Sequence, residues 1–233
     1  MDIERIAHEF MESSSERILK WAWDTFGETI VTTSSFQTQS VPLLHMISRM
    51  CPDMPVIFID TGYHFAETLD FRDRLVQRFG LNIKIIDCEK ENEEGTLPLY
   101  RVDPDQCCHN RKVIPMHQLL QRIEARAWVM GIRRNQTEQR SRISAIERGL
   151  DEIVRVYPLA NWTKQEVWEY VDRYNLPVHP LLKKGYISIG CEPCTRAVNP
   201  GENERAGRWS WTGKTECGLL EPMARPCVVT QSE

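Results

Sequence analysis

Residues 29–40 read TIVTTSSFQTQS, which joins a short β-branched run to a small polar turn. The β-branched residues 29–33 predict a buried strand. The apolar residues Val41, Leu44 and Ile47 predict that a helix begins directly after the turn. A strand, a small polar loop and a helix together present backbone N–H groups and a helix N-terminus to an anion. The loop lacks the glycine and lysine of a Walker phosphate loop, so the stretch favours an α/β fold with a different kind of anion or nucleotide site.

Further short apolar runs on both sides of this stretch have the composition of buried strands. We expect strands at residues 56–60, 83–87, 127–132 and 153–157, with helical segments between them. The pairs Ser13/Glu16 and Thr163/Glu166 have capping-box spacing and predict two helix starts. Residues 89–105 are acidic and rich in turn formers, and we expect them to form a loop. Strands that alternate with helices indicate an α/β domain.

Length and composition limit the function classes. The chain has 233 residues, of which 41% are hydrophobic and 27% charged, which suits one α/β domain with extensions. Its net charge of -4 disfavours a general nucleic-acid binder. No apolar run of about 18 residues predicts a membrane span, and the acidic start of the chain does not resemble a signal peptide. We therefore expect a cytoplasmic location, in which cysteines are metal ligands or reactive thiols rather than disulfides.

The cysteines form two dense sites. Cys191 and Cys194 form a Cys-x-x-Cys pair behind Gly190, and Cys107 and Cys108 are adjacent. Four thiols suit a metal site, either an iron–sulfur cluster or tetrahedral zinc. Adjacent cysteines point in different directions, which a compact cluster with ligands at several corners tolerates better than one zinc ion. A redox dithiol or plain buried cysteines are the remaining interpretations, and Cys51 and Cys88 belong to neither motif.

Polar side chains follow several of the predicted strands. Asp60, Thr61 and Gly62 form a turn at the end of one strand, where open α/β sheets bind ligands, although Asp60 could equally cap the next helix. Lys112 comes one helical turn after Cys108, so its charge could offset a thiolate or meet an anionic ligand. Four arginines that leave another strand suggest a phosphate- or sulfate-bearing ligand, or else a surface salt-bridge face: Arg133, Arg134, Arg140 and Arg142.

The composition changes after residue 198. Residues 199–213 are rich in Gly, Glu and Arg, and they lead to Cys217. We expect a nucleotide-binding domain over residues 1–198 and a mobile C-terminal segment over residues 199–233. A cysteine among cations in a mobile segment is a candidate nucleophile, because cations lower the pKa of a thiol. The alternative is a tail thiol without a role.

Several of these motifs together resemble the assimilatory sulfonucleotide reductases, specifically the cluster-containing branch. The resemblance runs from about Thr29 to Leu219, most of the chain. Its most specific parts are Cys107-Cys108, the stretch SIGCEPCT at residues 188–195, ERAGRW at 204–209 and KTECGL at 214–219. Weaker matches are Ser35-Phe36-Gln37, Asp60-Thr61-Gly62 and the GIRRNQ run at 131–136 with Arg140.

The resemblance implies a fold and a set of site residues. The fold would be a mostly parallel sheet of five to six strands with helices on both faces, like the adenine nucleotide α-hydrolases. Cys107, Cys108, Cys191 and Cys194 would hold a [4Fe–4S] cluster that supports the site and does not donate electrons. Lys112 would lie between cluster and substrate. The nucleotide would contact the remaining predicted positions, of which Arg205 and Arg208 would hold the phosphosulfate: Ser35, Phe36, Gln37, Asp60, Thr61, Gly62, Gly131, Arg133, Arg140, Arg205 and Arg208.

The resemblance also implies an activity in sulfate assimilation. Cys217 as a thiolate would attack the sulfur of adenosine 5′-phosphosulfate, release AMP and become an S-sulfocysteine. Reduced thioredoxin or a similar dithiol would then free sulfite. The partners would be this nucleotide and the dithiol protein, with no nucleic acid and no membrane, and we expect a homo-oligomer.

One position departs from the family pattern. Family members usually have histidine three residues after the cysteine, where this chain has Leu220, so activity could be reduced unless Lys214 or Arg208 compensates. The tail through Cys227 to Glu233 also lies outside the pattern. Cys227 could compete in thiol chemistry.

Three other functions remain open. The substrate could be 3′-phosphoadenosine 5′-phosphosulfate, or both nucleotides, because residues 34–40 could accept a 3′-phosphate. An ATP-using tRNA-thiolating enzyme of the same fold would need a Ser-Gly-Gly-x-x-Ser loop, which the chain lacks. A zinc-binding module without enzymatic activity is the most distant reading.

Overall fold

A six-stranded sheet forms the centre of the computed structural model, which describes residues 1–88 and 97–220. The strand order is β3-β2-β1-β4-β6-β5. All neighbouring strands pair in parallel except β5 and β6, which are antiparallel. The predicted mostly parallel sheet is confirmed. Its strands are β1 (Ile30–Thr33), β2 (Val56–Asp60), β3 (Ile83–Asp87), β4 (Ala127–Met130), β5 (Ile146–Arg148) and β6 (Val154–Val156).

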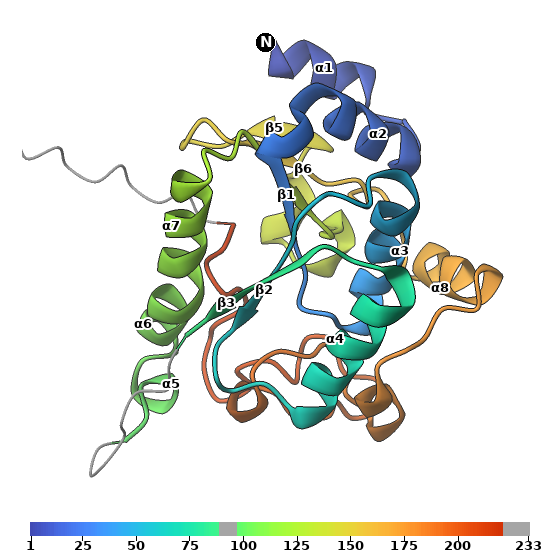
Figure 1. Cartoon of the computed structure of the whole chain (residues 1–233). Coiled ribbons are helices and arrows are strands. Elements are labelled where there is room, and N and C mark those ends of the chain that lie inside the picture. The colour runs from blue at the N-terminus through green and yellow to red at the C-terminus, as the bar shows by residue number, and fades with distance from the viewer. Residues whose placement is uncertain (89–96, 221–233) are drawn as a thin grey trace, which may run out of the picture.

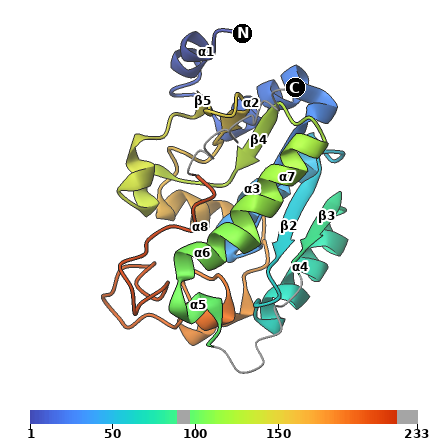
Figure 2. The same ribbon diagram turned by 90° about the vertical axis from the view of Figure 1, so that its left-hand side faces the viewer.

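Helices cover both faces of the sheet, as Figure 1 shows. One face carries α1 (Ile3–Glu9), α2 (Ser15–Phe26), α3 (Val41–Met50), α4 (Ala66–Phe79) and α8 (Lys164–Arg173). The other side carries α5 (Leu99–Val102), α6 (Pro104–Cys108), a π-helical turn (His109–Val113) and α7 (Ile114–Arg122), which follow one another in a column (Figure 2). None of the helices in the described ranges is both long and apolar enough to cross a membrane.

The inner strands β1, β2 and β4 bury both of their faces over most of their length, which explains their nearly continuous apolar or β-branched sequences. Ile30 of β1 packs in the cluster under α2, α3 and α4, whereas the next residue, Val31, packs in the cluster under α7. In β2, Phe58 packs in the cluster under α2, α3 and α4, and Ile57 packs in the cluster under α7. Successive side chains of a strand point to opposite faces, so each run of three or four apolar residues supplies both layers of the core.

Three expectations about single elements were wrong. The short antiparallel strand β5 was not predicted. Of the predicted loop at residues 89–105, residues 89–96 lie outside the described residues, and α5 and the start of α6 occupy most of the rest. Ser14, rather than Ser13, caps α2, and its hydroxyl accepts a hydrogen bond from Arg17 N. The capping box of Thr163 and Glu166 is confirmed at the start of α8.

The strand order changes direction next to β1. The chain proceeds from β1 outward to β2 and β3, and then returns to place β4 on the other side of β1. The loops that follow β1 and β4 therefore diverge from neighbouring strand ends. This is where open α/β sheets form ligand crevices.

Candidate active site

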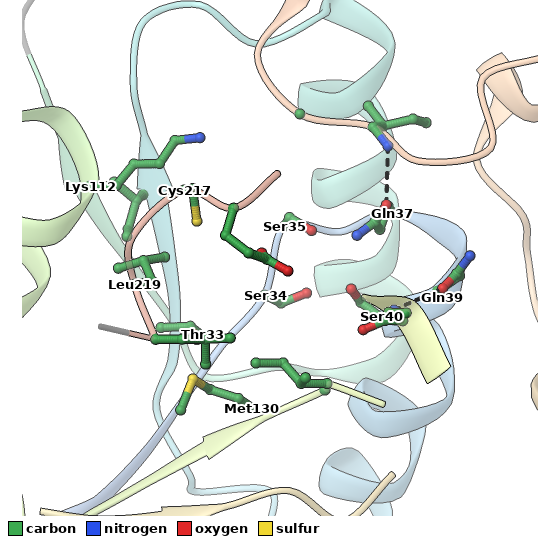
Figure 3. Close-up of a pocket in the computed structure, with 18 of the residues that line it drawn as sticks. Thr33, Ser34, Ser35, Gln37, Gln39, Ser40, Lys112, Met130, Cys217 and Leu219 are labelled. Atoms are coloured by element: carbon green, nitrogen blue, oxygen red, sulfur yellow. Dashed lines mark hydrogen bonds between the residues drawn. The ribbon is translucent and has the colours of Figure 1, made fainter. Parts of the chain in front are cut away.

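The main pocket lies at this change of direction and contains about 1240 Å³ of space free of atoms. We use the name main pocket for the cavity lined by residues after β1, after β2 and after β4, together with Lys112 and two C-terminal stretches. Figure 3 shows Cys217 with its sulfur pointing into it, next to Lys112 and Leu219. Its lining includes Ser34, Ser35, Gln37, Gln39, Ser40, His64, Lys112, Gly131, Gln136, Arg140, Gly190, Arg205, Arg208, Glu216 and Cys217.

The turn after β1 supplies one wall of the pocket. Ser35 and Gln37 line it, as the sequence predicted for a ligand site, but the side chain of Phe36 is fully buried in the core. Phe36 has a left-handed φ of 53°, and its N–H donates to the hydroxyl of Ser34 at 3.0 Å. Gln37 Oε1 accepts a hydrogen bond from Ile189 N at 3.1 Å. This bond ties the turn to the loop that carries Cys191.

The turn after β2 serves a different cavity. Asp60 Oδ1 accepts a hydrogen bond from Gly62 N at 3.0 Å, and Asp60 Oδ2 lies 3.8 Å from Arg72 Nη1, so this carboxylate stabilises its own turn. The hydroxyl of Thr61 lies 3.3 Å from Cys191 Sγ. Among the described residues that line the main pocket, neither Asp60, Thr61 nor Gly62 is found. From this turn the pocket receives His64 instead.

Four of the cysteines line a second, smaller cavity, which we call the cysteine cavity. Cys107 and Cys108 come from the end of α6, and Cys191 and Cys194 from the loop at 191–194. All four are buried, and the rings of Tyr63, Tyr100 and Trp209 complete the walls. The structure thus brings together the two predicted thiol pairs, which are more than 80 residues apart in the sequence. Within the described ranges, no three His, Cys, Asp or Glu side chains are arranged to hold a single metal ion.

Burial and mutual repulsion act on these thiols together. Burial raises the pKa of Cys107 to about 11 and that of Cys194 to about 12, and the neighbouring cysteines of the cavity add to both shifts. Burial would also raise the pKa of Cys191, but Lys112, the hydroxyl of Thr61 and Arg208 together lower it. Four thiolates therefore require positive charge within or beside the cavity.

Lys112 lies between the two cavities and lines both of them. Burial opposes its charge, but the thiols of Cys191, Cys108 and Cys217 hold the pKa of the ammonium above its usual range. Its placement on the same side as Cys108 was predicted from the spacing and is confirmed. Lys112 is thus a fixed cation between the cysteine cavity and the main pocket.

The segment after β4 forms a polar network at the pocket wall. The buried Arg133 donates from Nη2 to Gln39 Oε1 at 2.5 Å, while its Nε and Nη1 have no partner within the described residues. Gln136 Nε2 donates to the same oxygen at 3.0 Å. Arg140 Nη1 donates to Gln136 Oε1 at 2.5 Å. Gly131, Gln136 and Arg140 line the main pocket, and Arg133 lies behind them.

Arg208 lies against Gly190, next to the cysteine loop. Its Nη1 donates to Ile189 O at 3.2 Å, and its guanidinium lies 4.4 Å from the centre of the Trp209 ring. A side chain at position 190 would have its Cβ only 2.2 Å from Arg208 Nη2. Glycine at 190 is therefore what leaves room for this cation at the pocket.

Cys217 lies in the main pocket, half-buried, on a sharply turned segment. The next residue, Gly218, has a φ of 85°, which favours glycine. Leu219 and Leu220 then pack against the apolar cluster under α7. Leu220, at the position where histidine was expected, thus contributes apolar surface. Lys214 contacts the carboxylate of Asp105 and lies 5.4 Å from the centre of the Trp209 ring.

Sequence reasoning missed the roles of Glu216 and of two of the three glutamines that line the main pocket, Gln39 and Gln136. Glu216 is buried, and it binds the guanidinium of Arg140 with both carboxylate oxygens at 2.7 and 2.6 Å. Gln39 and Gln136 connect the wall after β1 to the wall after β4. These roles depend on contacts between distant segments, so no local pattern could reveal them. The position of Glu216 directly before Cys217 was the only available signal.

Comparison with known proteins identifies relatives over nearly the whole chain. Residues 29–197 match the family described as the phosphoadenosine phosphosulfate reductase domain. An adenosine 5′-phosphosulfate reductase of Halalkalibacterium halodurans is 38% identical over 225 residues, which are 94% of this chain and 96% of the relative. One from Streptomyces coelicolor is 40% identical over 224 residues, which are 93% and 92% of the two chains.

A solved structure has the same architecture. It is the phosphoadenylyl-sulfate reductase of Candida auris in a phosphate complex, with a TM-score of 0.72 and 27% sequence identity. The match covers 82% of this chain and 94% of that one. The fold expected from the sequence is therefore one that a solved reductase also has.

Proposed function

The chain belongs to the phosphoadenosine phosphosulfate reductase domain family, and from that premise we propose that it reduces adenosine 5′-phosphosulfate to sulfite and AMP in sulfate assimilation. The observation that carries this proposal is the content of the main pocket. A cysteine, Cys217, lies in it together with four cationic side chains, those of Lys112, Arg140, Arg205 and Arg208. A thiol that must attack an anionic sulfur centre requires such an environment.

The nucleotide would lie in the main pocket, along the turn after β1. Ser35, Gln37 and the N-terminus of α3 would face its polar groups, and Gly131 would allow close approach of the sugar or base. Phe36 and Arg133, which the resemblance implies as substrate contacts, would support the wall of the main pocket from behind. The turn of Asp60, Thr61 and Gly62 would act through the cysteine loop, because the hydroxyl of Thr61 lies 3.3 Å from Cys191 Sγ. The phosphosulfate would lie at the other end, near Lys112, Arg205 and Arg208, where Cys217 also lies.

The first chemical step would form an S-sulfocysteine. Cys217 Sγ, as a thiolate, would attack the sulfur atom in line with the bond to the bridging oxygen. That bond would break, and AMP would leave with its electron pair. Lys112, Arg205 and Arg208 would stabilise negative charge on the sulfonate and phosphate oxygens. No electron is transferred to the protein in this step.

The second step would release the product. A thiolate of a reduced dithiol protein, thioredoxin or a similar donor, would attack Cys217 Sγ and displace sulfite, which keeps the electron pair of the S–S bond. The second thiol of the donor would then attack the mixed disulfide and restore Cys217. The donor ends oxidised by two electrons and sulfur ends reduced by two. Exposure of Cys217 to this donor would require the segment after residue 198 to open.

The cysteine cavity has the donor set for an iron–sulfur cluster. Its four buried thiols come from two separate segments, its wall also holds three aromatic rings and the cationic side chains of Arg111 and Lys112, and the Nε1 of Trp209 is buried there without a partner among the described residues. Cys107, Cys108, Cys191 and Cys194 would hold a [4Fe–4S] cluster, which would supply a fixed charge beside Lys112 rather than electrons. The proposal includes that the protein forms a homo-oligomer and acts in the cytoplasm.

Turnover with each nucleotide tests this function. The anaerobically purified protein would be supplied with a reduced dithiol protein and with adenosine 5′-phosphosulfate or its 3′-phosphorylated form, and sulfite and AMP or its 3′-phosphorylated analogue would be measured. We expect a higher kcat/KM for the unphosphorylated substrate. The second candidate function is a reductase that also accepts the 3′-phosphorylated nucleotide. It is tested as well because the polar residues Ser34, Gln39 and Ser40 line the pocket and could bind a 3′-phosphate. No sulfite from either nucleotide would contradict the proposal.

A further inference from the structure

The buried carboxylate of Glu216 accepts hydrogen bonds from three side chains, those of Arg140, Thr137 and Arg205. Its two oxygens accept from Arg140 Nε at 2.7 Å and from Arg140 Nη2 at 2.6 Å. The hydroxyl of Thr137 donates to one oxygen at 2.9 Å, and Arg205 Nη2 lies 3.4 Å from the other. The side chain of Glu216 is only 6% exposed. Paired, planar contacts of this kind between Arg and carboxylate fix both distance and orientation.

These bonds join segments that are far apart in the sequence. Arg140 belongs to a 3₁₀ turn after β4 (Gln139–Arg142), Thr137 lies just before that turn, and Glu216 belongs to the last described stretch. Arg140 and Glu216 are connected across 76 residues. Although burial alone would raise the pKa of Glu216, the hydrogen bonds and charge of Arg140, with Arg205 and Thr137, hold it below its usual range. The carboxylate is therefore charged in this position at neutral pH.

The residue after this anchor is the candidate nucleophile. Adjacent Cα atoms are about 3.8 Å apart, so fixing Glu216 confines Cys217 to a small volume. Beyond Cys217, the left-handed turn at Gly218 leads to Leu219 and Leu220, which pack under α7. Cys217 is thus held on both sides, by a charged contact before it and by apolar contacts after it.

We propose that Glu216 is a positioning residue, which docks the C-terminal segment on Arg140 and so places Cys217 opposite Lys112. The inference rests on the function proposed above and adds the contact that brings the nucleophile to the substrate. Arg140 then has a second role beside lining the pocket. Arg205, which uses Nη2 for both Glu216 and Thr215 O, connects this anchor to the site of the phosphosulfate.

In a competing interpretation, Glu216 occupies the place of an anionic group of the substrate, and the nucleotide would displace Glu216 from Arg140 on binding. The bonds of Arg140 argue against it. Its Nε and Nη2 bind Glu216 and its Nη1 binds Gln136, so all three guanidinium nitrogens already have acceptors. Displacement of Glu216 would also pull Cys217 away at the moment when attack requires it.

The test compares Glu216→Gln with a matched control in the same segment. The control is Glu202→Gln, since Glu202 also pairs with an arginine through two hydrogen bonds, Arg196 Nη1 at 2.8 Å and Nη2 at 3.1 Å, but lies outside the main pocket. Two rates are measured. One is alkylation of Cys217 by iodoacetamide without nucleotide, read by peptide mass spectrometry. The other is single-turnover formation of the sulfo adduct from adenosine 5′-phosphosulfate.

We expect Glu216→Gln to slow adduct formation at saturating nucleotide roughly tenfold to a hundredfold, the size of a lost charged hydrogen-bond pair. We expect it to speed alkylation of Cys217 by about threefold or more, because the segment is released. The half-saturating nucleotide concentration should change by less than about threefold. Glu216→Asp should restore part of the rate, and Glu202→Gln should match the unmodified protein. Thermal unfolding and the absorption of the cluster serve as folding checks.

Several outcomes would overturn the inference. Equal adduct and alkylation rates in Glu216→Gln and the unmodified protein would show that Glu216 does not position Cys217. A markedly lower half-saturating concentration would favour the competing interpretation. If the unmodified protein forms no adduct at all, the proposed function fails. The alkylation rates, which need no nucleotide, then still decide whether the anchor exists.

Discussion

Gly190 controls the position of the Arg208 cation, because it has no side chain. A Cβ at this position would lie 2.2 Å from Arg208 Nη2 and 2.4 Å from Arg208 Cζ. The neighbour is the end of a flexible side chain, so the fold can adapt, but only by moving the guanidinium from Ile189 O and the face of Trp209. Alanine at 190 therefore displaces Arg208 without removing its charge.

We predict that Gly190→Ala raises the dissociation constant of adenosine 5′-phosphosulfate roughly tenfold, because a charged contact to the anion is lost. The melting temperature should change little. Gly213→Ala is the control, since no atom lies within 4 Å of its added Cβ. Isothermal titration calorimetry on the Cys217→Ser background, which prevents reaction, measures the constants. Equal dissociation constants for Gly190→Ala and Gly213→Ala would show that Arg208 does not contribute to binding of the anion.

Residue-level prediction worked where the chemistry is local. The Cys-x-x-Cys pair, the adjacent cysteines and the position of Lys112 on the side of Cys108 could all be predicted from spacing, and the structure brings them together. The environment of Glu216 could not be predicted, because two of its partners, Thr137 and Arg140, are more than 70 residues away in the sequence. The sequence left the role of Asp60 open, and the structure shows that it accepts a hydrogen bond within its own turn and does not line the main pocket.

At the scale of elements, the cysteine loop is held by backbone contacts to two neighbours. Glu192 N donates to Tyr63 O at 2.7 Å, and Trp209 N donates to Cys194 O at 3.0 Å. The loop is thus fixed between the turn after β2 and the C-terminal segment. This contact network presents Cys191 and Cys194 to the end of α6, where Cys107 and Cys108 lie.

We predict that Cys194→Ser loses iron, because one of four thiol ligands is replaced by a weaker ligand for iron. Cys88→Ser is the control, since Cys88 is half-buried and lies outside the cysteine cavity. Iron and inorganic sulfide would be measured on the anaerobically purified proteins, together with the visible absorption spectrum. A full complement of iron in Cys194→Ser would mean that the proposed ligand set is wrong.

Elements with strong periodicity were predicted well and short ones were not. The bounds of β2 and β3 are those expected, since both are rich in isoleucine and valine and each ends in an aspartate. The strand β5 has only three residues, Ile146–Arg148, and two of them are charged. It forms through its antiparallel pairing with β6 rather than through its own composition. Likewise α5 has only four residues in a polar, turn-rich stretch.

At the scale of the whole molecule, a buried histidine joins the layers beneath the pocket. His179 is fully buried, and its backbone N–H donates to the hydroxyl of Thr38, in the loop after β1. Its Nδ1 accepts from Leu181 N at 3.2 Å, so Nε2, 3.1 Å from the Thr68 hydroxyl on α4, carries the ring proton. Burial lowers the pKa of His179 to about 4, with Glu67 opposing and Arg74 adding to the shift.

This shift predicts acid sensitivity of the fold. Between pH 6.5 and about 4 the unfolded chain binds a proton at this histidine that the folded protein does not, so stability falls as the pH is lowered through that range. The shift corresponds to roughly 3 kcal/mol of unfolding free energy. We predict that His179→Asn is less stable than the unmodified protein at pH 7 but loses less unfolding free energy as the pH falls from 6.5 to about 4. Replacement of the exposed His8 is the control variant. Urea unfolding at several pH values measures it, and identical pH dependence in His179→Asn and the unmodified protein would contradict the prediction.

Three segments that are far apart in the sequence contribute to the proposed reaction. The turn after β1 would bind the nucleotide, the α6 region would carry two thiols and Lys112, and the C-terminal segment would bring Cys217 into the main pocket between them. The central claim is that Cys217 takes up the sulfo group. It does not depend on which dithiol protein later releases the sulfite.

Intact-protein mass spectrometry tests that claim most directly. The reduced protein and its Cys217→Ser variant would be incubated anaerobically with each sulfonucleotide and without a dithiol donor. We predict that adenosine 5′-phosphosulfate adds one sulfo group to the unmodified protein and none to the variant, while both retain the absorption of the cluster. No adduct on the unmodified protein, or the same adduct on Cys217→Ser, would contradict the mechanism.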